Sequence, residues 1–216
     1  MNKRSTQKEL MDLGPSYYSQ EEYEDCLKKL FLVGKYTGIH RDTFTLLKAI
    51  KPKTVLDVGC GDGALLAAIA KRLPDTLCHG IDISSEAIGH GHRYKAANVD
   101  FSCTDTLQPA DVIMANLVCH HMTDEELEHF LQQAYKNAGH LVLINDLHRH
   151  KLAKMLFSLI SRPLFSNRLI SHDGLVSIER GFCKNDIKRL INKIAPHSYT
   201  IRWRFPFRWQ VLLCKK

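Results

Sequence analysis

The segment VLDVGCGDG, residues 55–63, constrains this chain more than any other part of its sequence. An apolar run ends at Asp57, and glycines follow at positions 59, 61 and 63. Glycines in a turn between a buried strand and a helix allow the backbone to approach a ligand closely. The run from Gly59 to Ala64 satisfies the letters of the dinucleotide fingerprint, but such turns also serve simply as tight turns. The charged residues around the loop therefore indicate which ligand it is expected to bind.

Those charges disfavour a phosphate ligand. A dinucleotide places its anionic pyrophosphate at the helix N-terminus, where the carboxylates of Asp57 and Asp62 would repel it. No lysine or arginine lies between residues 54 and 70 to compensate. S-adenosylmethionine suits the loop better, because it carries an ammonium and a sulfonium but no phosphate. A nicotinamide cofactor is the disfavoured alternative.

Strand-like and helix-like segments alternate along most of the chain. Short apolar runs predict strands at 54–59, 77–83, 99–105, 111–118 and 140–146. The helix at 123–139 begins with a capping box, Thr123 and Glu126, and we expect Gly139 to cap its end. The alternation predicts an α/β fold with a doubly wound, mostly parallel sheet. Two further strands, at 199–205 and 207–214, meet at Pro206, so we expect a C-terminal antiparallel hairpin and seven strands in all.

The regions around this core predict the domain organisation. Residues 17–50 have helical spacing, so residues 1–50 are expected to form a helical N-terminal lid and 51–216 the main domain. An apolar and basic insertion at about 147–180 predicts a helical substrate cap. Its Lys154, Arg162 and Arg168 leave open a peripheral membrane contact, and a plain packing helix is an equal alternative.

Composition limits the class of protein without choosing a partner. The formal charge of +7 allows a nucleic acid, an anionic membrane or an acidic substrate, but the basic residues form no dense block. No apolar run approaches the length of a membrane-spanning helix, and the N-terminus lacks a secretory signal. Seven cysteines without a C-x-x-C pair predict reduced thiols in a cytoplasmic protein. The oligomeric state stays open.

Four motifs in order, VLDVGCGDG, GIDIS, CTDTL and NLVCHH, resemble the class I S-adenosylmethionine-dependent methyltransferases over residues 50–146. The resemblance implies that family's Rossmann-like fold, with S-adenosylmethionine as cofactor. The implied roles are attraction of the ammonium by Asp57, hydrogen bonds from ribose hydroxyls to Asp82, and recognition of the adenine amino group by Asp105. The full set of expected cofactor contacts is Asp57, Gly59, Cys60, Gly61, Asp82, Ile83, Asp105, Thr106, Asn116 and Leu117. Lys35 or Arg41 in the lid is the nearest expected partner for the cofactor's carboxylate.

Three further segments, KELMD, NDLHRH and HDGLVSIERGF, more loosely resemble a small-molecule branch of the family linked to quinone or polyketide-type metabolism. We therefore expect methyl transfer to an oxygen or activated carbon of a small aromatic or quinone-like molecule. The positive charge and the RWRFPFRW segment support an RNA or protein methyltransferase as an alternative, although no nucleic-acid partner is expected. A non-catalytic binding module on the same fold is the other alternative.

The candidates for proton transfer are His120 and His121 after the fourth strand, and Asp146 with His148 after the fifth. A histidine there is able to act as a base, because its ordinary pKa is about 6.5. It is also able simply to order the loop. Asp146 is expected to orient His148. With His150 these two would give only a weak metal signal, so no metal site is expected.

Overall fold

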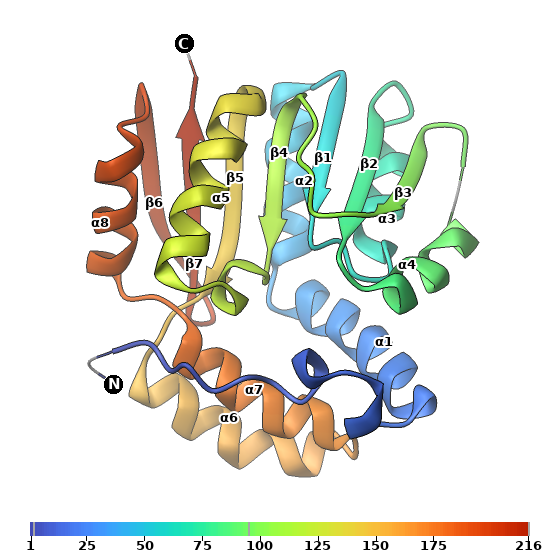
Figure 1. The fold of residues 1–216 in the computed structure, drawn as a ribbon, viewed down its shortest axis with the longest axis vertical. Helices are drawn as coiled ribbons and strands as arrows, with labels where there is room; N and C mark the ends of the chain where they lie inside the picture. Colours follow the sequence, from blue (N-terminus) through green and yellow to red (C-terminus); the bar gives the residue numbers. More distant parts are fainter. Residues whose placement is uncertain (2, 95, 216) are drawn as a thin grey trace.

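A twisted seven-stranded sheet runs through the centre of the described residues (Figure 1). The computed structural model describes residues 1–216 except 2, 95 and 216. The strands are β1 (Thr54–Val58), β2 (Leu77–Asp82), β3 (Val99–Cys103), β4 (Ala110–Asn116), β5 (Ala138–Leu147), β6 (Ser198–Arg204) and β7 (Arg208–Cys214). Their order is β3-β2-β1-β4-β5-β7-β6, parallel from β1 to β5, with β7 antiparallel to both of its neighbours. The predicted sheet and hairpin are confirmed.

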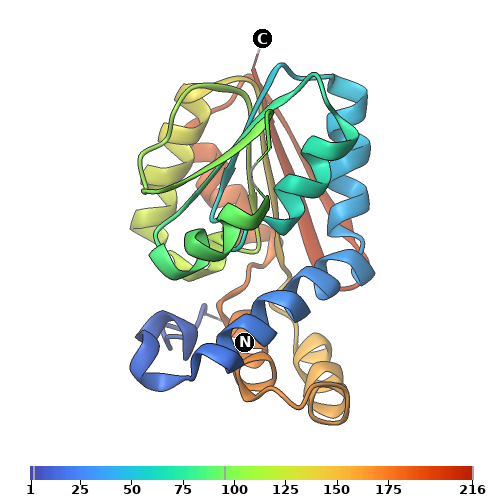
Figure 2. The ribbon, with the colours of Figure 1, turned by 90° about the vertical axis from the view of Figure 1, so that its right-hand side faces the viewer.

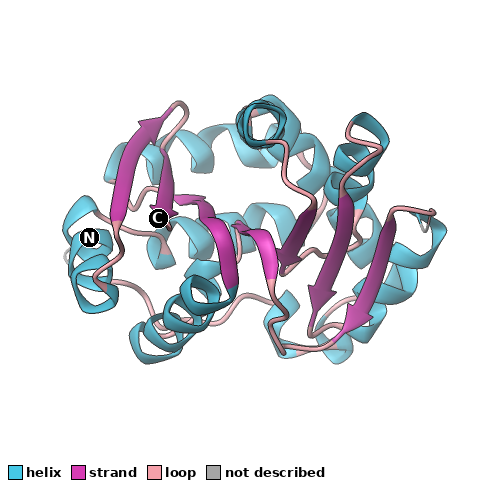
Figure 3. Cartoon of the chain, turned by 90° about the horizontal axis from the view of Figure 1, so that it is seen from above, coloured by secondary structure: helices cyan, strands magenta, loops and turns pink. Residues whose placement is uncertain are grey.

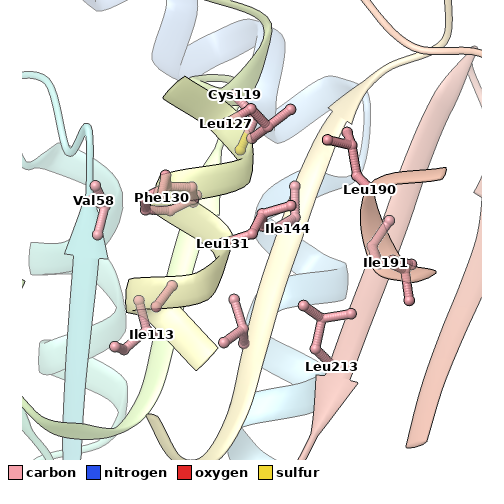
Figure 4. Packing of buried hydrophobic residues seen from close by; sticks show 14 of the residues in the cluster. Val58, Ile113, Cys119, Leu127, Phe130, Leu131, Ile144, Leu190, Ile191 and Leu213 are labelled. Atoms are coloured by element: carbon pink, nitrogen blue, oxygen red, sulfur yellow. The ribbon is translucent and has the colours of Figure 1, made fainter. Parts of the chain in front are cut away.

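Helices cover both faces of the sheet, as the doubly wound prediction requires (Figure 3). One apolar cluster joins the sheet to α2 (Ile39–Ile50), α3 (Ala64–Arg72) and α4 (Ser85–Gly91). The other joins it to α5 (Asp124–Asn137) and α8 (Lys184–Ile194), and Figure 4 shows its packing around Ile113, Leu131 and Leu213. Residues 112–115 of β4 are completely buried, because helices pack on both sides of this central strand.

A helical cap lies at the carboxyl ends of the parallel strands (Figures 1 and 2). It consists of residues 3–19, α1 (Gln20–Tyr36), α6 (Lys151–Leu164) and α7 (Arg168–Arg180). Asn167 donates to the Glu22 carbonyl at 2.8 Å, and Cys26 of α1 packs against Leu169 and Ile170 of α7. The N-terminal segment and the insertion therefore form one body over the edge where doubly wound sheets bind ligands.

The structure refines one local expectation and corrects another. The helical stretch 17–50 is two helices, separated at Gly38, which has φ +83°. The capping box at Thr123 is present, but α5 ends at Asn137 and Gly139 already belongs to β5. A β-carbon on Gly139 would lie 3.3 Å from the Asp111 Cα, so this glycine permits close strand approach and does not cap the helix.

Two of the three basic residues singled out in the insertion bind acids of the same chain. Lys154 pairs with Glu179, and Arg168 Nε donates to Glu22 at 2.8 Å. The side chain of Arg162 lies outside the described residues. Within the part of the chain that the structure describes, no helix has the length and apolarity needed to cross a bilayer.

Candidate active site

The glycine loop connects β1 to α3 and leaves free space at its centre. Gly59, Gly61 and Gly63 all have positive φ, between +57° and +73°. A β-carbon on Gly59 would lie 2.4 Å from Val118 Cγ2, so only glycine fits beneath the loop that follows β4. At Gly61, a β-carbon would meet no atom within 4 Å. The backbone at Gly61 is therefore open to a ligand.

Asp82 fixes this loop to the end of β2. Its Oδ2 accepts from the Gly61 N–H and its Oδ1 from the Ser84 N–H, both at 2.9 Å. The backbone N–H groups of Gly59 and Cys60 donate to the Ile81 carbonyl. Each carboxylate oxygen keeps a further lone pair, so Asp82 is able to accept from ligand hydroxyls without releasing the loop.

Four polar side chains form a row beside the loop: Asp57 on β1, Asn116 on β4, Asn145 on β5 and Arg208 on β7. These strands are neighbours, and their register places the four side chains on one face at the carboxyl ends. Each has a buried oxygen or nitrogen without a hydrogen-bond partner, and no other residue in the described part of the chain does. Buried polar atoms are normally paired. This row therefore has the polar groups to hold a ligand with charged ends.

The electrostatics of Asp57 favour a cationic ligand group. Burial raises the pKa of Asp57 to about 8; the Asn116 amide opposes this rise, and the nearby Asp82 adds to it. Its Oδ1 is one of the unpartnered atoms. A positive group placed beside this carboxyl would favour its ionised form and recover the lost solvation.

The other predicted cofactor residues lie along the same edge. Ile83 after β2 is 81% exposed, and Asp105 and Thr106 after β3 are exposed too. Leu117 after β4 has φ +56°, and its N–H donates to the Asn145 carbonyl at 2.8 Å. Cys60 lies within the loop itself, where burial raises its thiol pKa.

The two lid cations expected near the cofactor's carboxylate are exposed. Arg41 is 80% exposed and contacts Asp42, while Lys35 lies over the Tyr36 ring. Arg208 is buried on the same sheet face as Asp57, and its Nη2 donates to the Thr37 carbonyl at 2.7 Å and to Asp42 at 3.1 Å. Its Nε and Nη1 are unpartnered. Sequence reasoning missed Arg208 because it belongs to the hairpin, 150 residues from the loop.

His120 and Asp146 form a buried pair. His120 Nδ1 lies 2.8 Å from Asp146 Oδ1, and the His120 backbone N–H donates to Oδ2 at 3.2 Å. The His120 Nε2 lies 3.5 Å from Oε1 of Glu9, and the His120 side chain is 3% exposed. Burial alone would lower the pKa of His120, but the carboxylates of Asp146 and Glu9 raise it.

The sequence suggested that Asp146 orients His148, but in the structure Asp146 pairs with His120. His148 lies past the end of β5 and turns toward the hairpin, where its Nδ1 accepts from Trp203 Nε1 at 3.2 Å. It packs edge-on against Trp209. Burial lowers the pKa of His148, with the charges of His150 and Arg149 adding to the effect.

His121 is the more accessible of the two adjacent histidines. Its side chain is 31% exposed, and its Nδ1 lies 3.0 Å from Asp12 Oδ1. Arg180 holds the same loop by donating to the His120 carbonyl at 2.9 Å and to Asp12 at 3.1 Å. Glu9, Asp12 and Arg180 lie in segments that the sequence singled out, KELMD and HDGLVSIERGF, but no local signal pairs them with residue 120.

Comparisons with known proteins agree with this architecture. Residues 56–139 match a family described as a methyltransferase domain. The chain is 29% identical over 106 residues to 3-O-methylredipecamine 2-O-methyltransferase of Carapichea ipecacuanha, over 46% of this chain and 29% of that protein. It is 31% identical over 75 residues to trans-aconitate 2-methyltransferase of Pseudomonas paraeruginosa, over 32% and 26%. The match thus spans less than a third of each of these curated relatives.

Solved structures resemble the whole fold. The plantazolicin methyltransferase BpumL, crystallised with a pentazolic substrate analogue and S-adenosylhomocysteine, has a TM-score of 0.73 at 18% identity, over 95% of this chain and 93% of that one. Human N-acetylserotonin methyltransferase, crystallised with S-adenosylmethionine, has a TM-score of 0.67 at 18% identity, over 92% and 57%. The sheet order, the glycine loop and the matched segment lead to one conclusion. Residues 56–139 resemble a methyltransferase domain, and the described part of the chain has the fold of the methyltransferase structures named above.

Proposed function

We propose that this protein binds S-adenosylmethionine at the carboxyl edge of the sheet and transfers its methyl group to a small molecule. The observation that carries this proposal is the row of unpartnered buried polar atoms next to the open side of the glycine loop. The row runs from the carboxyl of Asp57 to the guanidinium of Arg208. Those two groups complement the ammonium and the carboxylate of the cofactor's methionine part.

Each end of the site has a role in this proposal. Asp57 attracts the ammonium, while Arg208 and Asn116 offer N–H donors to the carboxylate. Asp82 accepts from the ribose hydroxyls, and Gly61 lets the backbone approach. Ile83, Asp105 and Thr106 border the adenine, at the open ends of β2 and β3.

The cofactor supplies an electrophilic methyl group whose leaving group is a neutral thioether. The protein's contribution is then mainly to align the acceptor with that methyl group. His120 is a positioning residue here, because its ring is buried between Asp146 and Glu9. His121 is the imidazole that an acceptor can reach.

A small acceptor is favoured over RNA or protein. The methyltransferases matched above are named for small acceptors, such as trans-aconitate and N-acetylserotonin. In RWRFPFRW, Arg204 donates to Gln210 and Arg208 is buried, so of its three arginines only Arg202 is exposed to contact a phosphate backbone. We place the methylated atom at an oxygen or activated carbon, as the sequence suggested.

Calorimetric titration with S-adenosylmethionine and S-adenosylhomocysteine tests the cofactor assignment. Wild type should bind near one equivalent, and Arg208→Lys should weaken binding at least about tenfold, or about 1.4 kcal/mol. Arg149→Lys is the matched control, because Arg149 is equally buried but binds Gly181, Asp186 and the Met1 carbonyl through its three nitrogens.

No binding by folded wild type would refute the proposal. Equal weakening by both arginine variants would show that the effect is general destabilisation. If the cofactor binds, transfer of a labelled methyl group to a mixed set of phenols, quinones and carboxylic acids then tests the acceptor class. Binding without turnover on any of them would favour the non-catalytic alternative.

A further inference from the structure

A cluster of metal-binding side chains lies where the N-terminal segment meets the loop after β4. Glu9 precedes the 3-10 turn Met11–Leu13, and His120 and His121 belong to the turn Cys119–His121. One ligand atom from each of the three lies within 4.8 Å of the other two. Glu9 and His120 are buried, while His121 is partly exposed, so the cluster is enclosed but reachable.

Both histidines present the same nitrogen to Glu9. His120 Nδ1 faces Asp146 at 2.8 Å, and His121 Nδ1 faces Asp12 at 3.0 Å. With a metal ion bound, a proton on each Nδ1 would satisfy these carboxylates, and each Nε2 lone pair would bind the ion beside Glu9. Metal-bound histidines commonly have this outer carboxylate, which fixes the tautomer and the orientation of the ring.

The separations of the ligand atoms are close to those of metal ligands. His120 Nε2 lies 3.5 Å from Glu9 Oε1, and His121 Nε2 lies 3.8 Å from Glu9 Oε2. Both distances exceed the usual range for an N–H···O hydrogen bond. Two ligands about 2.0–2.1 Å from a tetrahedral zinc ion are about 3.3–3.4 Å apart. These two distances end on different oxygens of Glu9, and one ligand atom from each of the three residues lies within 4.8 Å of the others, so shifts of up to about 1.5 Å would bring all three to coordination distance.

The charges around the cluster also favour a divalent cation. Three carboxylates, Glu9, Asp12 and Asp146, touch the two imidazoles, and Arg180 pairs with Asp12. With both rings neutral, these groups carry a net charge of −2. Arg4 contacts the same loop, but it forms its own ion pair with Asp124.

We propose that Glu9, His120 and His121 bind one Zn²⁺ ion, leaving one coordination position for a water or another oxygen ligand. The ion would link the N-terminal segment to the loop after β4 and, through Asp146, to β5. This site does not depend on the proposed methyl transfer, because metal content is measured without the cofactor. With the ion bound, His121 is a ligand and an acceptor oxygen would meet the metal in place of a free imidazole.

The test uses the full chain without an affinity tag, stripped by a chelator and then titrated with Zn²⁺ against a chromophoric competitor. Elemental analysis gives the stoichiometry, and wild type should bind one equivalent. Glu9→Gln and His121→Gln should each weaken binding at least about 100-fold, and Asp12→Asn about 10–100-fold. His148→Gln is the matched control and should bind as wild type does.

Several outcomes would overturn the site. The proposal fails if folded wild type does not bind Zn²⁺ stoichiometrically. It also fails if Glu9→Gln and His121→Gln both bind as wild type does, or if His148→Gln loses binding. The chain has seven free cysteines, so Co²⁺ is the second probe. A spectrum with thiolate charge-transfer bands would assign the metal to cysteines and refute the nitrogen and oxygen ligands. His121 is partly exposed, so His121→Gln keeps the test valid if Glu9→Gln fails to fold.

Discussion

Replacing Gly61 by alanine tests most directly whether the glycine loop binds the cofactor. Its φ of +57° lies in the left-handed region, and an added β-carbon would meet no protein atom within 4 Å. The new methyl group would instead occupy the space that we assign to the ligand. Gly61→Ala should therefore weaken cofactor binding without disrupting the core.

The two effects have different sizes. The left-handed backbone costs a non-glycine residue about 1–2 kcal/mol. For a chain of this length that lowers Tm by about 2–8 °C. Occupation of the ligand space should weaken binding at least about tenfold, or about 1.4 kcal/mol.

Gly14→Ala separates the two effects. Gly14 also has positive φ, +93°, and nothing within 4 Å of an added β-carbon, but it lies in the N-terminal segment. With ψ near 176° its conformation is nearly restricted to glycine, at a cost of about 1–3 kcal/mol. Gly14→Ala should thus lose at least as much stability as Gly61→Ala and keep its affinity for S-adenosylhomocysteine in calorimetry. Wild-type affinity in Gly61→Ala, or equal weakening in both variants, would refute the reasoning.

Four further predictions concern stability. Burial raises the pKa of Asp57 to about 8, so its contribution to stability is complete below about pH 4 and is lost as the pH rises through 8. The difference in Tm between Asp57→Asn and wild type should accordingly shift in favour of the variant as the pH rises from about 5 to 8.5. Parallel plots of Tm against pH for the two proteins would contradict this. Burial, with Lys35 and Arg72, lowers the pKa of His40 to about 4, so the contribution of His40 to stability is lost as the pH falls from about 6.5 to 4. His40→Gln should therefore make Tm less dependent on pH in that window. In urea unfolding, Gly89→Ala should raise the free energy of unfolding by about 0.5–1 kcal/mol, because this helical glycine has open space around it. Gly34→Ala should cost about 1–3 kcal/mol, because its β-carbon would lie 2.4 Å from His40 Nε2, and a gain there would contradict the packing.

The parts of this protein that could be predicted from sequence are those encoded locally. The glycines of the β1–α3 loop need only their neighbours to form a turn, and the alternation of strands and helices determines the sheet. Asp82 is a good example. Its place at the end of β2 follows from the strand pattern, and its bond to Gly61 follows from the parallel pairing of β1 with β2.

The acidic residues around the histidines could not be placed in this way. Glu9 meets His120 across more than a hundred residues, and neither periodicity nor spacing encodes that contact. The sequence paired Asp146 with His148 because they are close in the chain and share a strand face. In the structure Asp146 instead pairs with His120, because the loop after β4 lies beside the end of β5 and turns inward there.

The two charged regions at this edge of the sheet differ in how their charges are arranged. On the face covered by α2, the row from Asp57 to Arg208 has one acid and one base at opposite ends, which suits a zwitterionic ligand. On the other side, Glu9, Asp12 and Asp146 surround two imidazoles, which suits a cation or an oxygen acceptor. Val118 packs over Gly59, and the next residues of the same loop carry the histidines. A ligand that moves the glycine loop would therefore shift the histidine cluster, so cofactor and Zn²⁺ affinities should be coupled, and each should be measured with the other present.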